Sequence, residues 1–129
     1  MIHWHGASAI VIDNSKLLIV KSKTEQKWTI PTGGLETDET SEQACIREVL
    51  EETGYDVKIL KYIESKDKSV KNYQVKVDYY LCSVISGELI INDPDEEIDE
   101  IRWVSNREFN ELDWLYPEDT FMIKQYIGE

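Results

Sequence analysis

Four charged residues whose types and spacing suit a metal site lie between positions 47 and 52: Arg47, Glu48, Glu51 and Glu52. On a helix, residues three or four positions apart are neighbours, so Glu48 would stand beside Glu51 and Glu52, with Cβ atoms about 5–6 Å apart. Like charges at this spacing repel by roughly 0.2–0.5 kcal/mol per pair. A divalent cation with oxygen ligands would turn this repulsion into attraction. The pattern therefore indicates a metal site, with a solvated acidic helix face as the alternative.

The residues around these side chains predict a helix over 40–53. Thr40 and Gln43 have the spacing of a capping box at its start, and Gly54 stands where helices commonly end in a left-handed residue. A helical wheel separates an apolar face from the charged one. The apolar face consists of Cys45, Ile46, Val49, Leu50 and Thr53. We expect this face to be buried against a sheet and the carboxylate cluster to be exposed.

The remaining elements are expected to surround this helix. Two apolar segments, 7–12 and 16–21, are joined by Asp13, Asn14 and Ser15, which is typical of a β-hairpin. We expect further strands over 28–31, 57–63, 73–85 and 101–104, a tight loop over 32–34, and helices over 106–112 and 117–127. Strands around a central helix, with another helix at the end, predict an α/β sandwich.

Composition limits the classes of partner. The chain has 129 residues, of which 26 are acidic and 14 are basic, and its net charge is −12. A surface this acidic repels a long phosphate backbone, which argues against a protein that coats DNA or RNA. A small phosphorylated substrate remains compatible, because a bound divalent cation inverts the local charge.

Other features of the sequence bear on the compartment. The apolar runs 9–12 and 17–20 are far too short to cross a membrane, and the first residues lack the basic and apolar regions of a secretion signal. Cys45 and Cys82 both fall in apolar patterns, as expected of reduced, buried thiols. We therefore expect a soluble, cytoplasmic protein with no membrane partner.

The charged helix and its flanks form a longer motif. This motif consists of Gly33, Glu39 after five intervening residues, and the run from Arg47 to Tyr55 after seven more, which together have the spacing of a 23-residue pattern. This pattern resembles the signature of the Nudix (MutT-like) hydrolases, and every fixed glycine, glutamate and arginine of that signature is present. The resemblance implies an α/β fold of the Nudix type, an α/β/α sandwich with a mixed sheet, as a single domain over residues 1–129. Two positions depart from the family pattern. Thr32 stands where members commonly have glycine, and Tyr55 stands at an aliphatic position.

The resemblance also implies a reaction and a metal site. Nudix hydrolases act on a nucleoside diphosphate linked to another moiety, as pyrophosphohydrolases in which water attacks phosphorus, with Mg²⁺ or Mn²⁺ as cofactor. By position, the metal ligands would be Glu48, Glu51 and Glu52, with the carbonyl of Thr32 as a possible addition. Arg47 would orient the carboxylates through charge-assisted hydrogen bonds, and Glu39 would brace the loop before the helix.

The general base is harder to assign from the sequence. In several family members a glutamate before a strand that ends in tryptophan contributes, and Glu97 lies six residues before Trp103. Other acidic residues crowd the same segment: Asp93, Asp95, Glu96, Asp99 and Glu100. The alternatives are that Glu52 is the base, or that the acidic segment is only a solvated loop.

Candidate substrate-binding residues are aromatic or basic. Tyr73 lies eighteen residues beyond Tyr55, a spacing that recurs in family members acting on dinucleoside polyphosphates, and Trp114 and Tyr116 could stack on a base. Trp28 is better explained as a core residue. A second set, formed by Lys66, Lys68 and Lys71, is expected in a loop or at the tip of a hairpin, where these lysines could meet phosphates or be merely solubilising.

Two other functions are compatible with the sequence. A Nudix domain that senses a nucleotide without hydrolysing it usually lacks some of the carboxylates, whereas this chain keeps all three. An RNA 5′-end pyrophosphohydrolase that contacts only the terminus would tolerate the acidic surface. The expected partner is a small nucleotide substrate. Homodimers are frequent in the family, and a homodimer is therefore also considered.

Overall fold

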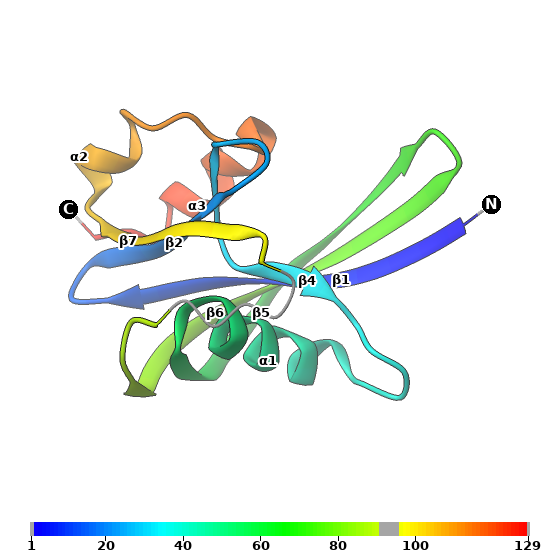
Figure 1. Cartoon of the computed structure of the whole chain (residues 1–129), viewed down its shortest axis with the longest axis horizontal. Coiled ribbons are helices and arrows are strands. Elements are labelled where there is room, and N and C mark those ends of the chain that lie inside the picture. Colours follow the sequence, from blue (N-terminus) through cyan, green and yellow to red (C-terminus); the bar gives the residue numbers. More distant parts are fainter. Residues whose placement is uncertain (1, 91–95, 129) are drawn as a thin grey trace.

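The computed structural model describes residues 2–90 and 96–128. Within these described residues, seven strands form one sheet: β1 (Ile2–Asp13), β2 (Lys16–Ser22), β3 (Trp28–Thr29), β4 (Thr32–Gly34), β5 (Tyr55–Val70), β6 (Tyr73–Gly87) and β7 (Ile98–Val104). The helices are α1 (Ser41–Thr53), α2 (Asn106–Phe109), the 3₁₀ helix η1 (Pro117–Asp119) and α3 (Thr120–Lys124). Figure 1 shows α1 on one side of the strands and α2 and α3 on the other.

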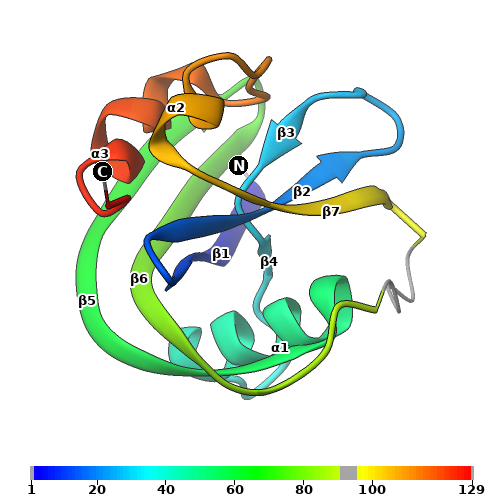
Figure 2. The same cartoon turned by 90° about the vertical axis from the view of Figure 1, so that its left-hand side faces the viewer.

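The long first strand joins two parts of the sheet. Its partner β6 runs parallel to it from Ile2 to Val11, and β5 extends this part as an antiparallel neighbour of β6. β4 pairs with β1 over residues 6–8, whereas β2 pairs with β1 over residues 12–13 and carries β3 and β7. The sheet is therefore mixed, and the short strand β4 lies between its two parts (Figures 1 and 2).

Both faces of the central strands are buried. Alternate side chains of a strand point to opposite faces, so Val11 and Leu18 pack toward α1, whereas Ile10 and Leu17 pack toward the C-terminal helices. Figure 2 shows these two helical layers on opposite sides of the sheet. Burial on both faces explains why 9–12 and 17–20 are continuous apolar runs rather than alternating ones. The predicted α/β/α sandwich with a mixed sheet is confirmed.

The predicted N-terminal hairpin, the short strand at Trp28 and the buried thiols are all present. Asn14 and Ser15 turn between β1 and β2 with positive φ angles of 49° and 65°. Cys45 and Cys82 are buried and free, and their Sγ atoms lie 3.8 Å apart across the interface between α1 and β6.

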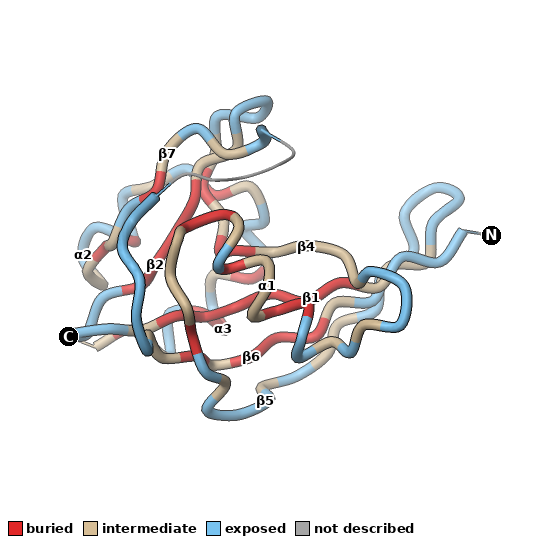
Figure 3. Tube along the Cα trace, turned by 60° about the horizontal axis from the view of Figure 1, so that its bottom comes forward, coloured by how far each residue is buried: buried red, intermediate tan, exposed pale blue. Residues whose placement is uncertain are grey.

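Two expectations about strands were wrong. Residues 32–34 form the strand β4 rather than a tight loop, because their backbone pairs with β1. Lys66 and Lys68 lie within β5 rather than in a loop, and only Lys71 lies in the turn to β6. These distal parts of β5 and β6 form a ribbon that is largely exposed (Figure 3). Residues 64–69 of β5 are all polar or charged, so this segment lacks the apolar alternation that marks a half-buried strand.

The C-terminal helices are shorter than the sequence predicts. α2 has four residues behind a capping box formed by Ser105 and Glu108, and the following segment leaves the helix to pair with Trp28. The backbone amide of Trp28 donates a hydrogen bond to the carbonyl of Asp113, at 3.0 Å, and the carbonyl of Trp28 accepts one from the amide of Leu115, at 2.8 Å. In the described part of the chain, every helix lacks either the length or the hydrophobicity that crossing a membrane would need.

Candidate active site

Both ends of α1 are fixed by local hydrogen bonds, as predicted. The hydroxyl of Thr40 accepts from the amide of Gln43, and the side chain of Gln43 accepts from the amide of Thr40, which completes the capping box. At the other end Gly54 adopts a left-handed conformation with φ 86°, and its amide donates to the carbonyl of Leu50. This conformation strains residues with a Cβ, which accounts for glycine here.

The buried face of α1 differs from the prediction at two positions. Cys45, Val49 and Thr53 are buried against the sheet as expected, but Leu50 is 48% exposed and Glu52 is only 5% exposed. Residues 45, 49 and 52 follow the i, i+4, i+7 spacing of one helix face. Glu52 therefore lies on the same stripe as two core residues, and the expectation of a wholly exposed carboxylate cluster was wrong.

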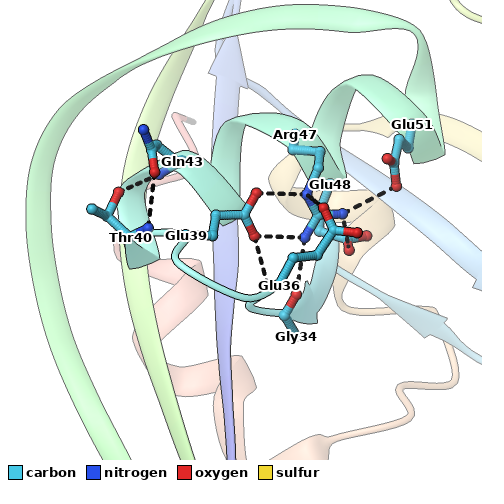
Figure 4. A network of polar contacts seen from close by, with 8 residues as sticks. All are labelled: Gly34, Glu36, Glu39, Thr40, Gln43, Arg47, Glu48 and Glu51. Atoms are coloured by element: carbon cyan, nitrogen blue, oxygen red, sulfur yellow. Dashed lines mark hydrogen bonds and ion pairs between the residues drawn. The ribbon is translucent and has the colours of Figure 1, made fainter.

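Arg47 connects α1 to the segment before it (Figure 4). Its guanidinium donates two parallel hydrogen bonds to the carboxylate of Glu39, at 2.7 and 2.9 Å, and a third to the carbonyl of Gly34, at 2.9 Å. Its Nη1 atom donates to Glu48 at 2.8 Å and to Glu51 at 3.2 Å. The contact with Arg47 lowers the pKa of Glu39, and Glu39 in turn raises the pKa of Arg47, so both groups stay ionised. The arginine thereby holds two helix carboxylates and the β4 backbone in fixed positions.

A pair of carboxyl groups, Glu48 and Glu52, lies beside this network. The two side chains are within hydrogen-bonding reach of each other, and burial raises the pKa of Glu48 although Glu52 and Arg47 oppose the rise. Two carboxylates this close in a partly buried place repel each other, and a proton or a cation between them relieves the repulsion. Their hard oxygen atoms suit Mg²⁺ or Mn²⁺, so the residues present fit the expected cofactor.

A cavity of about 310 Å³ opens beside this pair. Glu48 and Glu52 line it from α1, and Thr32 and Gly33 line it from β4. Glu97, just before β7, lines the same cavity. The structure thus brings together residues from three separate segments of the chain, and the metal-ligand roles of Glu48, Glu51, Glu52 and the Thr32 carbonyl stay predictions.

Three observations bear on the predicted metal-ligand roles of the glutamates and of Thr32. Within residues 2–90 and 96–128, no group of three or more histidine, cysteine, aspartate or glutamate side chains is already gathered as a metal site. Glu51 instead contacts Arg47. The hydroxyl of Thr32 bonds to Ser8 at 2.7 Å, so threonine is accommodated where the family pattern has glycine.

Among the alternatives to Glu97, Asp99 accepts a hydrogen bond from Gln26, and Glu100 forms an ion pair with Arg102. Asp93 and Asp95 lie outside the described residues.

The predicted aromatic residues fall into two groups. Tyr73 and Tyr116 are exposed and line a second cavity of about 470 Å³ next to the first. Trp114 is 9% exposed, packs on Phe109 and donates to its carbonyl at 3.0 Å, which leaves little of its surface free, and its role in base stacking stays a prediction. Trp28 is a core residue, as predicted.

Trp4 was not identified from the sequence, although it lines both cavities. The position of Trp4 on β1 could have indicated this role, because alternation along the strand puts Trp4 on the same face as Ser8 and Ile10. A large aromatic side chain at the end of a buried strand face, still 37% exposed, is available to a ligand.

Substitution of Gly33 by alanine tests how closely β4 approaches Glu48. A methyl group at Gly33 would overlap the Glu48 carboxyl group, which is the far end of a flexible side chain and can move aside. We therefore expect Gly33→Ala to leave the free energy of unfolding within about 1 kcal/mol of the wild type and to weaken Mg²⁺ binding. Urea unfolding and metal titration measure the two effects. Unchanged metal affinity would show that the position of Glu48 does not matter.

Comparison with known proteins identifies the family. The model of the NUDIX domain matches residues 3–126. The chain is 33% identical over 123 residues to mRNA-decapping enzyme subunit 2 of Arabidopsis thaliana, covering 93% of this chain and 31% of that protein. It is 31% identical over 101 residues to a Bacillus subtilis protein provisionally named as an 8-oxo-dGTP diphosphatase, covering 78% of this chain and 65% of that protein. The chain thus spans less than two thirds of the length of either relative.

Solved structures agree on the fold. A NUDIX hydrolase from Nitrosomonas europaea superposes with a TM-score of 0.82 at 23% identity, covering 95% of this chain and 88% of that one. A NUDIX-family hydrolase from Clostridium perfringens gives a TM-score of 0.79 at 19% identity, covering 95% and 94%. With the family model matching nearly every residue and the charged motif placed on α1 beside β4, the chain belongs to the NUDIX domain family.

Proposed function

We propose that this chain is a metal-dependent pyrophosphohydrolase that cleaves a nucleoside diphosphate linked to another moiety. The observation that carries the proposal is the close Glu48–Glu52 pair beside the cavity that Thr32, Gly33 and Glu97 also line. A partly buried pair of like charges costs stability unless something bound there compensates for it. Its retention in a chain whose net charge is already −12 supports a functional role.

Each residue has a definite task in this proposal. Glu48, Glu51 and Glu52 would hold the divalent cation, and the carbonyl of Thr32 would be a further oxygen donor. Arg47 keeps Glu48 and Glu51 in place, since it donates to both. When bound, Mg²⁺ or Mn²⁺ supplies charge neutralisation of the diphosphate and activation of a water molecule. Glu97 accepts the proton that the water loses as it attacks phosphorus, and the P–O bond of the anhydride breaks to release two phosphate-bearing products.

A second candidate, the hydrolysis of an RNA 5′ end, is favoured by one finding. The Arabidopsis thaliana relative, 33% identical over nearly the whole chain, is named as a subunit of an mRNA-decapping enzyme. The net charge of −12 disfavours extended contacts with an RNA backbone. Because contacts limited to the terminus would avoid this repulsion, we rank this candidate below a small nucleotide.

A hydrolysis screen tests the proposal and separates the candidates. The chain is incubated with nucleoside diphosphate derivatives, nucleoside triphosphates and capped or triphosphorylated short RNA, with Mg²⁺, Mn²⁺ or EDTA, and both products are identified. We expect cleavage of a small nucleotide that requires the metal. Cleavage confined to RNA would establish the second candidate. Metal-dependent binding of nucleotide without any product would instead indicate a sensor and overturn the proposal.

A further inference from the structure

Two histidines, the only ones in the sequence, lie on one face of β1. His3 and His5 are two positions apart in a stretch that pairs with β6 without a register shift. Because alternate side chains of a strand share a face, both imidazoles stand on the side of the sheet that Ala7 and Val11 turn toward α1. The rise of a strand puts their Cα atoms about 6.6 Å apart. Two imidazoles at this spacing can bind one ion between them, since each ligates from about 2 Å.

The ring of His5 is oriented by a buried carboxylate. Its Nε2 atom lies 2.6 Å from Oδ2 of Asp78, which is buried. An ionised carboxylate only accepts hydrogen bonds, so Nε2 carries the proton and the neutral ring keeps its lone pair on Nδ1. Ser65 donates to the other carboxylate oxygen of Asp78 and holds it in place. Histidines that bind metals are commonly oriented in this way, through a hydrogen bond from the second ring nitrogen to a carboxylate.

The remaining nitrogen of His5 faces away from Asp78. Asp78 lies opposite Ala7 in the register of β1 and β6, so its carboxylate contacts His5 from the side of Ala7. The two nitrogens of an imidazole direct their hydrogens or lone pairs to opposite sides of the ring, which leaves Nδ1 on the side of His3. His3 is exposed, and the side chain of His5 is 39% exposed. An ion from solvent can therefore reach both rings.

We propose that His3 and His5 form a binding site for Zn²⁺ or a similar divalent transition metal, with Asp78 as the residue that orients His5. Imidazole nitrogen suits Zn²⁺, Ni²⁺ and Cu²⁺, whereas Mg²⁺ prefers oxygen ligands. Water would complete the coordination of the ion. Lys76, the neighbour of His5 on β6, is exposed and lies opposite Asp67 on β5, so the charges beside the site are balanced. This site goes beyond the proposed function and does not depend on hydrolysis.

Imidazole signals in proton NMR test the site directly. Untagged protein at slightly alkaline pH is titrated with ZnCl₂ in an excess of MgCl₂, which competes for the carboxylates of α1. With two histidines in the chain, the Cε1 proton of each gives one signal, which His3→Gln and His5→Gln assign. We expect both signals to shift together and to stop changing at one Zn²⁺ per chain. A shift of only one signal, or of neither, would overturn the inference.

Variants in a calorimetric titration with Zn²⁺ assign the binding to residues. His3→Gln and His5→Gln should each abolish saturable binding in the excess of Mg²⁺. Asp78→Asn should weaken binding about 10–100-fold, the usual loss when a residue that orients a metal ligand is changed. Glu52→Gln is the matched control, since it makes the same carboxylate-to-amide change beside the other candidate metal site, and it should keep the Zn²⁺ affinity within about twofold.

These variants also separate the two sites. Zn²⁺ binding that Glu52→Gln abolishes and His3→Gln keeps would place the ion at the carboxylates of α1 and refute the inference. Thermal unfolding checks that Asp78→Asn keeps the fold, and a folded variant with wild-type affinity would refute the role of Asp78. If Asp78→Asn does not fold, Ser65→Ala tests the same orientation and should weaken Zn²⁺ binding. Zn²⁺ binding at the histidines of a protein that hydrolyses no nucleotide would support this inference and refute the proposed function.

Discussion

Replacement of Glu52 by glutamine is expected to lower kcat by about 10²–10³-fold, the size typical for the loss of one preorganised charge-stabilising group. Glu52 lines the cavity from α1 and lies within hydrogen-bonding reach of Glu48. Glutamine keeps the shape of the side chain and half of its oxygen atoms, but it has no negative charge to hold a divalent cation. Steady-state hydrolysis of the substrate found in the screen measures the effect.

The control for this variant lies on the same helix. Glu42 is exposed in the first turn of α1, so Glu42→Gln makes the same chemical change away from the cavity and should keep kcat within about twofold, as surface substitutions usually do. Because Glu52 is 5% exposed, thermal unfolding of both variants must show that the fold is kept. A folded Glu52→Gln protein with wild-type kcat would contradict the proposed role of Glu52.

Replacement of Arg47 by methionine is expected to destabilise the protein by about 2–4 kcal/mol, because it breaks a largely buried network of ion pairs. The variant leaves Glu39, Glu48 and Glu51 close together without their cation, and it leaves the carbonyl of Gly34 without this donor. The arginine is 21% exposed, so solvent screens part of the loss. Urea unfolding at pH 7 measures the free energy.

Two comparisons make the Arg47 prediction specific. Arg47→Lys keeps the charge but cannot donate two parallel hydrogen bonds to Glu39. Its free energy of unfolding should therefore fall between those of the wild type and Arg47→Met. The pKa of Glu39 is lowered in the folded protein. The contribution of Glu39 to the stability difference between the wild type and Arg47→Met is therefore complete above the ordinary glutamate pKa, about 4.3. This contribution is lost as the pH falls through the lowered pKa. An Arg47→Met protein as stable as the wild type at pH 7 would show that the network contributes nothing.

Features determined by neighbours in the chain were predictable from the sequence. The start and end of α1 follow from Thr40, Gln43 and Gly54, whose hydrogen bonds are local. The hairpin at Asn14 and Ser15 and the buried central strands follow from turn chemistry and from long apolar runs. In each case the deciding interaction lies within a few residues or within one strand.

Features set by tertiary contacts were not predictable in this way. The apolar wheel of α1 placed Leu50 inside and Glu52 outside, whereas the packing of α1 against the sheet and β4 reverses both. The segment 113–115 lies beside β3 because the backbone of Trp28, far away in the sequence, binds the backbone of Asp113 and Leu115. That contact also explains why Trp114 is a core residue.

The candidate site shows the same division. The motif on α1 predicts which carboxylates bind the metal, but the proximity of Gly33 to Glu48 depends on the pairing of β4 with β1. The second cavity requires the 3₁₀ helix η1 to bring Asp119 to Lys66 across 53 positions of the chain. No pattern in the sequence marks such a pairing.

The most direct measurement of the central claim is a crystal structure of the wild-type protein with Mn²⁺, in which anomalous scattering locates the ion. We expect an anomalous peak between the carboxyl groups of Glu48 and Glu52, on the side of the cavity that Thr32 borders, and no such peak in Glu52→Gln crystals. A peak elsewhere, or none in crystals of protein that hydrolyses its substrate with Mn²⁺, would contradict the assignment of these carboxylates to the metal.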